Sequence, residues 1–280
     1  MRILVGYDGR PGSRDALALA KALCESGETD LIVACVRPYW PDLVGAESFP
    51  MLVEEDERWV RRGATPALGA TPFSTRVVAE GHETAGLKVL AEAEESDVII
   101  IGSTDRGRPG HVCPGSVGER VLDRAPCAVA VAPRGLADGD ASIHEIAIGY
   151  DGSQASKVAL RRAIGLADRC QASLLILGAV EISLGLAGYE TRQPKELQKV
   201  GMERHIQRAL EAVPATIAAR SELLVGAPSR ALVDAASDAD LLVLGSRGNY
   251  AVDQRLVLGT VGTAAMRSAA CPTLVTPTAS

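Results

Sequence analysis

The sequence predicts an α/β protein made of two repeated, open, parallel five-stranded sheets flanked by helices. Three observations lead to this prediction: the length and composition of the chain, an internal repeat, and an alternation of short apolar runs with helical patterns. The chain has 280 residues, which exceeds the roughly 100–150 residues of a typical single domain. Hydrophobic residues make up 47% of it but aromatic residues only 3%, so we expect a core of Val, Leu, Ile and Ala under helices.

A motif near the start of the chain recurs 143 residues later. Gly6–Gly9 reads GYDG and returns as GYDG at Gly149–Gly152, where 149 − 6 = 143. Downstream positions keep the same offset, as Asp97 and Asp240 show. A period of this length indicates a duplicated globular domain and not a solenoid.

The repeat divides the chain into two domains joined by a short linker. The polar, Gly-rich stretch between the repeats is typical of a linker. We therefore predict a first domain over residues 1–134, a linker over 135–142 and a second domain over 143–280.

Within each half, β-branched runs alternate with helical patterns, which is typical of successive βαβ units and a parallel sheet. In the first half we predict strands at Ile3–Tyr7, Leu31–Arg37, Thr75–Ala79, Val98–Gly102 and Ala128–Ala132. In the second half we predict strands at Glu145–Tyr150, Ser173–Val180, Leu223–Val225, Leu241–Gly245 and Thr273–Thr276. Helices are expected in the intervals, beginning with a core-facing helix over Ser13–Cys24.

Composition and charge argue against several classes of function. The net charge of −6 gives no basic field for a nucleic acid, so no nucleic-acid partner is expected. No apolar run approaches the roughly 20 residues that cross a bilayer, and the start of the chain shows no secretory signal, so we expect no membrane contact and a cytoplasmic protein. The six cysteines form no CxxC pair and no metal-ligand spacing, so no metal-binding residue is expected.

A candidate phosphate-binding loop follows the fourth predicted strand of the second half. Ligands of open parallel sheets bind at the carboxyl ends of the strands, where the strand order reverses. The sequence there reads Gly245, Ser246, Arg247, Gly248, then ten residues, then Gly259-Thr260-Val261 at the start of a helix. Glycines permit close backbone approach and positive φ, and a helix start offers unpaired amide donors with a positive dipole end. Gly245, Gly248, Gly259, Thr260 and Val261 are therefore predicted to contact phosphates.

The first half carries a variant of the same loop. Gly102 is followed by Asp105, and after nine further residues Gly115, Ser116 and Val117 open a helix. Asp105 stands where the second half has Gly248. Aspartate tolerates left-handed backbone geometry, but its charge would repel a polyphosphate unless Arg106 or Arg108 offsets it.

An aspartate and a glycine end the first strand of each half: Asp8-Gly9 and Asp151-Gly152. The carboxylates lie close to the expected crevice, where they could accept hydrogen bonds from an adenine amine or from ribose hydroxyls. The alternative interpretation is that each carboxylate caps the following helix. The two interpretations are compatible.

Together these motifs resemble the universal stress protein family over nearly the whole chain, twice. The resemblance implies a Rossmann-like, adenine nucleotide alpha hydrolase-like fold. It also implies that the Gly-rich loops bind ribose and phosphates, that Asp8 and Asp151 bind adenine, and that backbone at Val36 and Val180 contacts the base.

The resemblance further implies how the two halves pair. Domains of this family associate through their last strands, so Ala128–Ala132 should join Thr273–Thr276 in an intrachain pseudo-dimer. Pairing of these apolar strands would also protect edges that otherwise invite aggregation. Association of two such chains into a homodimer is a further expectation.

The function expected from this resemblance is that of an ATP-binding universal stress protein of a bacterial cytoplasm, acting as a nucleotide-dependent regulator or sensor in the stress response. Its ligand would be ATP or another adenine nucleotide, with or without Mg²⁺, and its protein partner is unknown. We expect no catalytic residues and no enzymatic activity, because no Gly-x4-Gly-Lys-Ser/Thr loop and no set of Mg²⁺ ligands is evident. The alternatives are a nucleotide-independent interaction module with degenerate pockets and, behind it, a weak ATPase. A dinucleotide oxidoreductase is disfavoured because Gly9–Gly12 does not fit Gly-x-Gly-x-x-Gly.

Overall fold

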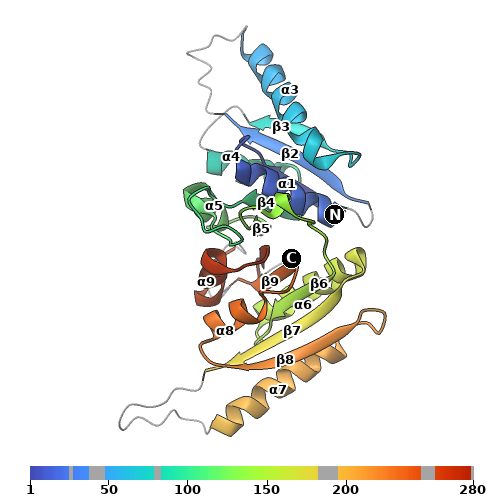
Figure 1. The fold of residues 1–280 in the computed structure, drawn as a ribbon, viewed down its shortest axis with the longest axis vertical. Helices are drawn as coiled ribbons and strands as arrows, with labels where there is room; N and C mark the ends of the chain where they lie inside the picture. The colour runs from blue at the N-terminus through green and yellow to red at the C-terminus, as the bar shows by residue number, and fades with distance from the viewer. Residues whose placement is uncertain (25–27, 38–47, 79–82, 182–194, 247–255, 279–280) are drawn as a thin grey trace.

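The protein forms one ten-stranded sheet with helices packed on both faces (Figure 1). The computed structural model describes residues 1–24, 28–37, 48–78, 83–181, 195–246 and 256–278. Within those residues the first half contains β1 (Arg2–Gly6), α1 (Pro11–Cys24), β2 (Asp30–Val36), α3 (Phe49–Leu68), β3 (Ser74–Val78), α4 (Glu83–Ala93), β4 (Val98–Gly102), α5 (Gly115–Leu122) and β5 (Ala128–Ala132). The short helix η1 (Leu136–Asp138) follows, and the second half contains β6 (Glu145–Gly149), α6 (Gln154–Cys170), β7 (Ser173–Val180), α7 (Lys195–Glu211), β8 (Ala219–Val225), α8 (Pro228–Ala235), β9 (Leu241–Gly245), α9 (Thr260–Ser268) and β10 (Thr273–Thr276).

The strand order confirms the predicted fold class. The order is β3-β2-β1-β4-β5-β10-β9-β6-β7-β8, and the five strands of each half pair in parallel. In the first half β2 and β3 lie on one side of β1, and β4 and β5 lie on its other side. In the second half β7 and β8 lie on one side of β6, and β9 and β10 lie on its other side. The strand order therefore reverses between β1 and β4 and between β6 and β9. These two reversals are the places where a doubly wound sheet binds ligands.

The two halves join through an antiparallel pairing of β5 with β10, as the pseudo-dimer arrangement predicts. Ala130 pairs with Leu274, and 274 − 130 = 144, which is the repeat offset once the extra residue of the second Gly-rich loop is counted. Val131 pairs with Thr273, and Val129 pairs with Val275. The pseudo-twofold axis therefore passes between Ala130 and Leu274, and each half meets the other as it would meet a copy of itself.

Helices divide between the two faces of the sheet according to their order in each half. One core lies under α1, α3, α6 and α7, and includes Leu17, Val60, Ala163 and Ile206. The other lies under α4, α5, α8 and α9, and includes Leu87, Val121, Leu232 and Met266. With helices on both faces the central strands are buried on both sides, which explains their continuous apolar runs.

One predicted strand is substantially longer than expected. β8 begins at Ala219, whereas the sequence predicts a strand only over Leu223–Val225. β8 is the edge of the sheet, and its first four residues are exposed, so they carry no apolar signal. The predicted strands that correspond to β1, β2 and β6 each end one residue too late, whereas Ala79, the predicted last residue of the strand that corresponds to β3, lies outside the described residues.

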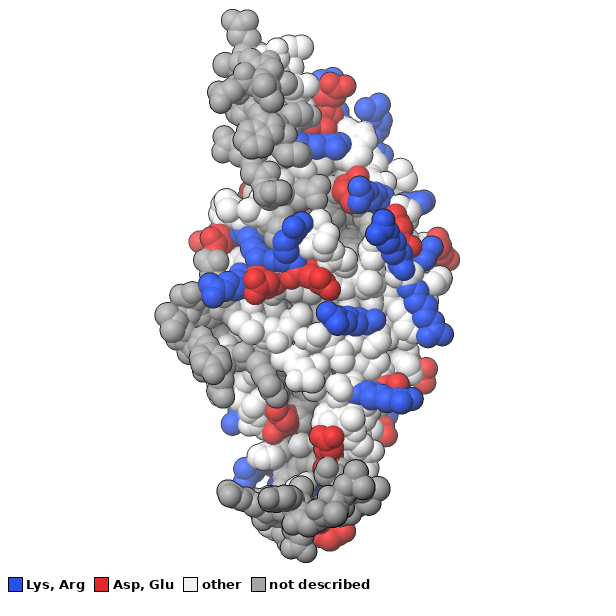
Figure 2. All heavy atoms as spheres, turned by 90° about the vertical axis from the view of Figure 1, so that its left-hand side faces the viewer, with Lys and Arg blue, Asp and Glu red and all other residues white. Residues whose placement is uncertain are grey.

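Charged side chains of both signs are interspersed on the face that carries α4, α5, α8 and α9, which Figure 2 shows. Among them, Arg267 of α9 lies 3.9 Å from Glu119 of α5, so this ion pair joins the two halves. Both side chains are more than half exposed, and an ion pair of this kind contributes little to stability. Among the described helices, none combines the length and the apolar character that a membrane span requires.

Candidate functional site

A pocket of about 190 Å³ opens at the carboxyl ends of β1, β2 and β4, where the strand order of the first half reverses. Six of the residues predicted for ligand binding line it: Asp8, Val36, Gly102, Gly115, Ser116 and Val117. The amino-terminal turns of α1 and α5 complete the rim. The structure thus brings the aspartate, the second-strand position and the Gly-rich loop together at one site.

Asp8 holds the turn between β1 and α1. Its Oδ1 accepts hydrogen bonds from the Arg10 N–H at 2.9 Å and from the Ser13 hydroxyl at 2.5 Å, and the Asp8 N–H donates to that hydroxyl oxygen. The carboxylate side chain is still 57% exposed. Asp8 therefore organises the entry to α1, and its exposed carboxylate lines the pocket, where the ligand contact predicted for it stays a prediction.

Gly9 serves packing and not the pocket wall. Its φ of +78° is one that glycine adopts readily, and a Cβ there would lie 2.6 Å from the Trp59 ring of α3. Gly9 is not among the residues that line the pocket. The packing of Trp59 therefore accounts for the glycine at this position, and the ligand contact predicted for Gly9 stays a prediction.

Trp59 belongs to an aromatic cluster that the sequence analysis missed. Its ring centroid lies 5.2 Å from that of Tyr7 at the end of β1, and the Arg37 guanidinium lies 4.7 Å above the Trp59 ring. Burial, followed by the nearby Asp8 charge, raises the pKa of the Tyr7 hydroxyl. Trp59 has no motif around it, and only its packing against Gly9 and Tyr7 connects it with the site.

Gly102 is required for contact with helix α1. A Cβ built on Gly102 would overlap the backbone carbonyl of Gly12, and one built on Gly12 would overlap the Ser103 carbonyl. The end of β4 and the first turn of α1 therefore meet backbone to backbone. Gly102 also lines the pocket, but the absence of a side chain there is already explained by this contact.

The loop between β4 and α5 is closed by its own hydrogen bonds. The buried Ser103 hydroxyl donates to the Ala132 carbonyl at 2.6 Å and accepts from the Cys113 N–H at 2.9 Å. Arg134 donates from Nη1 to the Gly107 carbonyl at 2.8 Å. These bonds tie the loop to β5 and to Arg134, and a loop held in this way loses less entropy when it binds a ligand.

The loop ends at the amino terminus of α5. Gly115 has φ +65°, the left-handed conformation predicted for a glycine of the loop. The first amides of α5, including those of Ser116 and Val117, belong to the turn that has no acceptor within the helix. Amides of this kind are donors that suit an anion, and they lie at the pocket.

Asp105 lines the same pocket and is exposed. Within the described part of the chain it forms no ion pair with Arg106 or Arg108, both of which are exposed as well. The charge compensation considered from the sequence is therefore not preformed.

The second half repeats the strand-end geometry of the first. Asp151 accepts a hydrogen bond from the Ser153 N–H at 2.9 Å, and Gly152 has φ +79°, with the His205 ring of α7 where its Cβ would lie. Burial alone would raise the pKa of the Asp151 carboxyl, but hydrogen bonds from Ser153 and Ser156 outweigh it and lower the pKa. His205 thus takes the place that Trp59 has in the first half.

Other parts of the second site differ from the first. Gly259 has φ −84°, so the positive φ predicted for the glycines of the loop is wrong at this position. Thr260 and Val261 begin α9 as predicted, whereas Gly248 lies outside the described residues.

The remaining predicted residues of the second half lie at the strand ends. Val180 is buried, and its carbonyl accepts a hydrogen bond from the Gly226 N–H at 3.0 Å. A Cβ on Gly245 would lie 2.5 Å from the Ala155 carbonyl, so this glycine is required by the contact with the first turn of α6, as Gly102 is by the contact with α1. Over the described ranges no group of three or more His, Cys, Asp or Glu side chains could hold a metal ion.

The comparisons with known proteins agree on one family. The model of the universal stress protein family matches residues 1–133 and again residues 142–277. A universal stress protein of Mycobacterium tuberculosis is 30% identical over 181 residues, which is 60% of this chain and 61% of that protein, so the match spans about three fifths of that relative. A second universal stress protein of M. tuberculosis is 25% identical over 248 residues, covering 84% of this chain and 82% of the relative.

Solved structures show the same fold over the whole chain. A universal stress protein from Archaeoglobus fulgidus superposes with a TM-score of 0.68 at 18% identity, covering 99% of this chain and 96% of that one. A protein from Pseudomonas aeruginosa described as a putative universal stress protein superposes with a TM-score of 0.65 at 14% identity, covering 98% and 92%. At these identities the likeness concerns the fold.

Proposed function

Because this chain belongs to the universal stress protein family, we propose that it binds ATP or another adenine nucleotide and acts as a nucleotide-dependent sensor in the stress response, not as an enzyme. The observation that carries the proposal is the first-half pocket. It has acceptor oxygens of Asp8 on one wall and the amino terminus of α5 on another.

Each wall of the pocket suits one part of a nucleotide. The α5 terminus at Gly115–Val117 offers amide donors and a positive dipole end to phosphate oxygens. The exposed Asp8 carboxylate can accept hydrogen bonds from an adenine amine or from ribose hydroxyls. Val36 and Leu87 supply apolar surface for the base.

The sensing step requires the nucleotide to stabilise one state of the protein over another, because a ligand acts only through differential affinity. The Gly-rich loop is the natural element for this step, since it lines the pocket and is tied through the Gly107 carbonyl to Arg134, which directly precedes the linker. A protein partner would then recognise the surface of the ordered loop. A bacterial cytoplasmic location and a homodimer belong to the same proposal.

Asp105 supports a second candidate, in which the first pocket is degenerate and the protein is a nucleotide-independent interaction module. Its carboxylate faces the pocket without a preformed cationic partner among the described residues. Comparison of wild type with Asp105→Gly separates the candidates: if the pocket works, the wild-type first half already binds nucleotide and the variant binds it more tightly, whereas if Asp105 has made the pocket degenerate, only the variant binds.

The main experiment measures nucleotide content. Purified protein is denatured, and the released nucleotide is identified and counted per chain by mass spectrometry, followed by calorimetric titration with ATP, ADP and AMP, with and without Mg²⁺. The matched variants are Ser116→Glu in α5 and Thr260→Glu in α9. Both positions are exposed first-turn residues, where a carboxylate suits the helix dipole but repels a phosphate.

Each variant should remove the nucleotide of its own half, and the double variant should remove all of it, with the melting temperature nearly unchanged. No nucleotide in the wild-type protein and no uptake of added ATP would refute nucleotide binding and favour the interaction module. Steady ATP turnover that Ser116→Glu abolishes would refute the assignment as a non-enzyme.

A further inference from the structure

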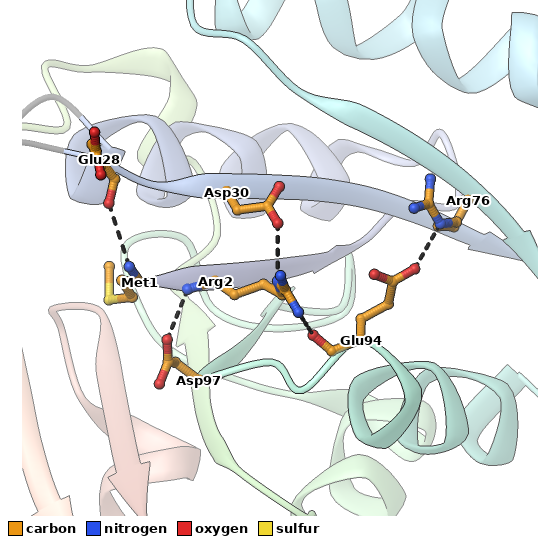
Figure 3. Close-up of polar contacts among 7 residues, drawn as sticks. All are labelled: Met1, Arg2, Glu28, Asp30, Arg76, Glu94 and Asp97. Carbon is orange, nitrogen blue, oxygen red and sulfur yellow. Dashed lines mark hydrogen bonds and ion pairs between the residues drawn. The ribbon is translucent and has the colours of Figure 1, made fainter.

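The two halves differ at the amino ends of β4 and β9. Asp97 precedes β4 and accepts the Arg2 N–H at 2.7 Å (Figure 3). Asp240, which corresponds to Asp97 in the repeat, precedes β9 and accepts hydrogen bonds from the N–H groups of His144 at 2.7 Å and Glu145 at 2.9 Å. The two aspartates are thus held in the same way by the neighbouring strand.

An arginine from the other half covers Asp97. Arg162 of α6 donates from Nη2 to the Asp97 carbonyl at 2.5 Å, and its Nη1 lies 3.7 Å from Asp97 Oδ1. The guanidinium is thus placed to face both the backbone and the carboxylate of one residue. Its side chain is 27% exposed, so the contact is partly withdrawn from water.

Among the described residues no arginine covers Asp240 in the same way, and the position that corresponds to Arg162 is Leu19 (162 − 143 = 19). Leu19 lies in α1 and is only 1% exposed. A leucine is shorter than an arginine and carries no donor, so the reciprocal contact across the pseudo-twofold axis is not made.

A cavity of about 150 Å³ lies at this position. Leu19, Asp240 and Cys271 line it together. Cys271 corresponds in the repeat to Cys127, which lies near Arg162. The linker forms the remaining wall and contributes the exposed carboxylate of Asp140.

The linker wall is fixed by α1. The carboxylate of Asp15, 3% exposed, accepts hydrogen bonds from the Gly135 N–H at 3.0 Å and from the Ala137 N–H at 2.9 Å. Asp15 and Leu19 both belong to α1, so the helix that carries Leu19 also holds the linker over the cavity. The cavity is therefore a formed feature of the junction between the halves.

We propose that this cavity binds a small alkylguanidinium cation, whose guanidinium faces Asp240 as the guanidinium of Arg162 faces Asp97. A planar guanidinium can donate to a carbonyl and a carboxylate together, whereas an ammonium donates as a point charge. The Asp140 carboxylate adds a second negative charge, and Leu19 and Pro133 offer apolar contact to the alkyl part. The proposal does not depend on nucleotide binding.

The test is a titration of the full chain with ethylguanidinium chloride, followed by amide NMR, with ethylammonium chloride at equal ionic strength as the matched control. We expect saturable shifts of the Ala239, Asp240 and Cys271 amides with ethylguanidinium, and much smaller ones with ethylammonium. The Ser96 and Asp97 amides should not move.

Three variants make the test specific. Leu19→Arg supplies a tethered guanidinium and should abolish the shifts, and Asp240→Asn should weaken binding at least tenfold. Arg162→Leu should open the mate site, so that ethylguanidinium now also shifts Ser96 and Asp97. This last variant keeps the proposal testable if Leu19→Arg does not fold.

Two results would overturn the proposal. Absence of saturable shifts at Asp240 in the wild-type protein would mean that the cavity takes no such cation. Equal shifts with ethylammonium would mean that the site selects charge alone and not the guanidinium group.

Discussion

Val112, in the Gly-rich loop of the first half, donates its backbone N–H to the Ala269 carbonyl of the second half at 2.8 Å. The pseudosymmetric bond also forms: the Leu256 N–H donates to the Ala125 carbonyl at 3.1 Å. Val112 and Leu256 both have an exposed fraction of 0%. Each loop that borders a candidate nucleotide site is therefore anchored in the other half.

This cross-anchoring predicts slow hydrogen exchange for Val112 and Leu256, although neither belongs to a helix or strand. Their amides should exchange only when the two halves separate, because burial and the bond across the junction both protect them. Amide exchange followed by NMR measures this, with the exposed Asp105 and Arg106 amides of the same loop as fast-exchanging references. Exchange of Val112 at the rate of Arg106 would contradict the anchoring.

Two glycine-to-alanine substitutions should have opposite effects on stability. Gly102→Ala places a Cβ against the Gly12 carbonyl, and we expect the free energy of unfolding to fall by about 2–3 kcal/mol because backbone must move. Gly165 lies on the exposed side of α6, and nothing lies within 4 Å of the Cβ that Gly165→Ala adds. The free energy of unfolding of this variant should therefore rise by about 0.5–1 kcal/mol through helix propensity. Urea denaturation measures both, and equal effects of the two would contradict the packing argument.

Arg2 joins three elements of the first half, at the end of its strands that lies away from the pocket (Figure 3). Its Nε donates to Asp30 Oδ2 of β2 at 2.9 Å, and its Nη1 donates to the Glu94 carbonyl after α4. Because the side chain is 37% exposed, Arg2→Ala should cost only about 1 kcal/mol.

The matched control for Arg2 is Arg10→Ala. Arg10 lies 3.8 Å from Asp8, and its side chain is 78% exposed, so the loss should stay within about 0.5 kcal/mol. Thermal and urea unfolding would measure both variants. A larger effect at Arg10 than at Arg2 would show that the network of Figure 3 does not stabilise the fold.

Stability should fall in alkaline solution through Tyr7 and Tyr150, the two tyrosines that directly follow β1 and β6. Burial, and then the neighbouring aspartate, raises the pKa of Tyr7 and of Tyr150 above the ordinary value of 10.0. The folded state therefore holds these protons more tightly, so their contribution is complete below pH 10.0 and is lost as the pH rises through the folded pKa values.

The double variant Tyr7→Phe/Tyr150→Phe removes both titrations. Its free energy of unfolding should decline less than that of the wild-type protein between pH 8 and about pH 11. Urea unfolding at the two pH values provides the comparison. Parallel declines would mean that other groups cause the alkaline loss.

The sequence by itself determined the fold class, the duplication and most strand bounds. Continuous apolar runs such as Val98–Gly102 reflect burial on both faces of the sheet, which is a local signal. The motif residues of the first half were also recognisable, and six of them meet in one pocket. The pairing of β5 with β10 followed from resemblance to the family and is confirmed.

Other features depended on contacts between distant segments. The first residues of β8 are polar because they lie at an edge, and Gly9 needs its glycine because Trp59 packs on it from another element. No pattern within a single segment records such contacts, because they arise when elements far apart in the chain come together.

The junction between the halves shows most clearly which features the sequence determined and which the tertiary structure decided. The repeat aligns Leu19 with Arg162, but it does not reveal that Arg162 covers Asp97 or that a cavity lies beside Leu19. Propensity and hydrophobic period are local properties, so the sequence determined the elements and their order. Which side chains meet across the pseudo-twofold axis was decided only by the tertiary structure, because that depends on the docking of two complete halves.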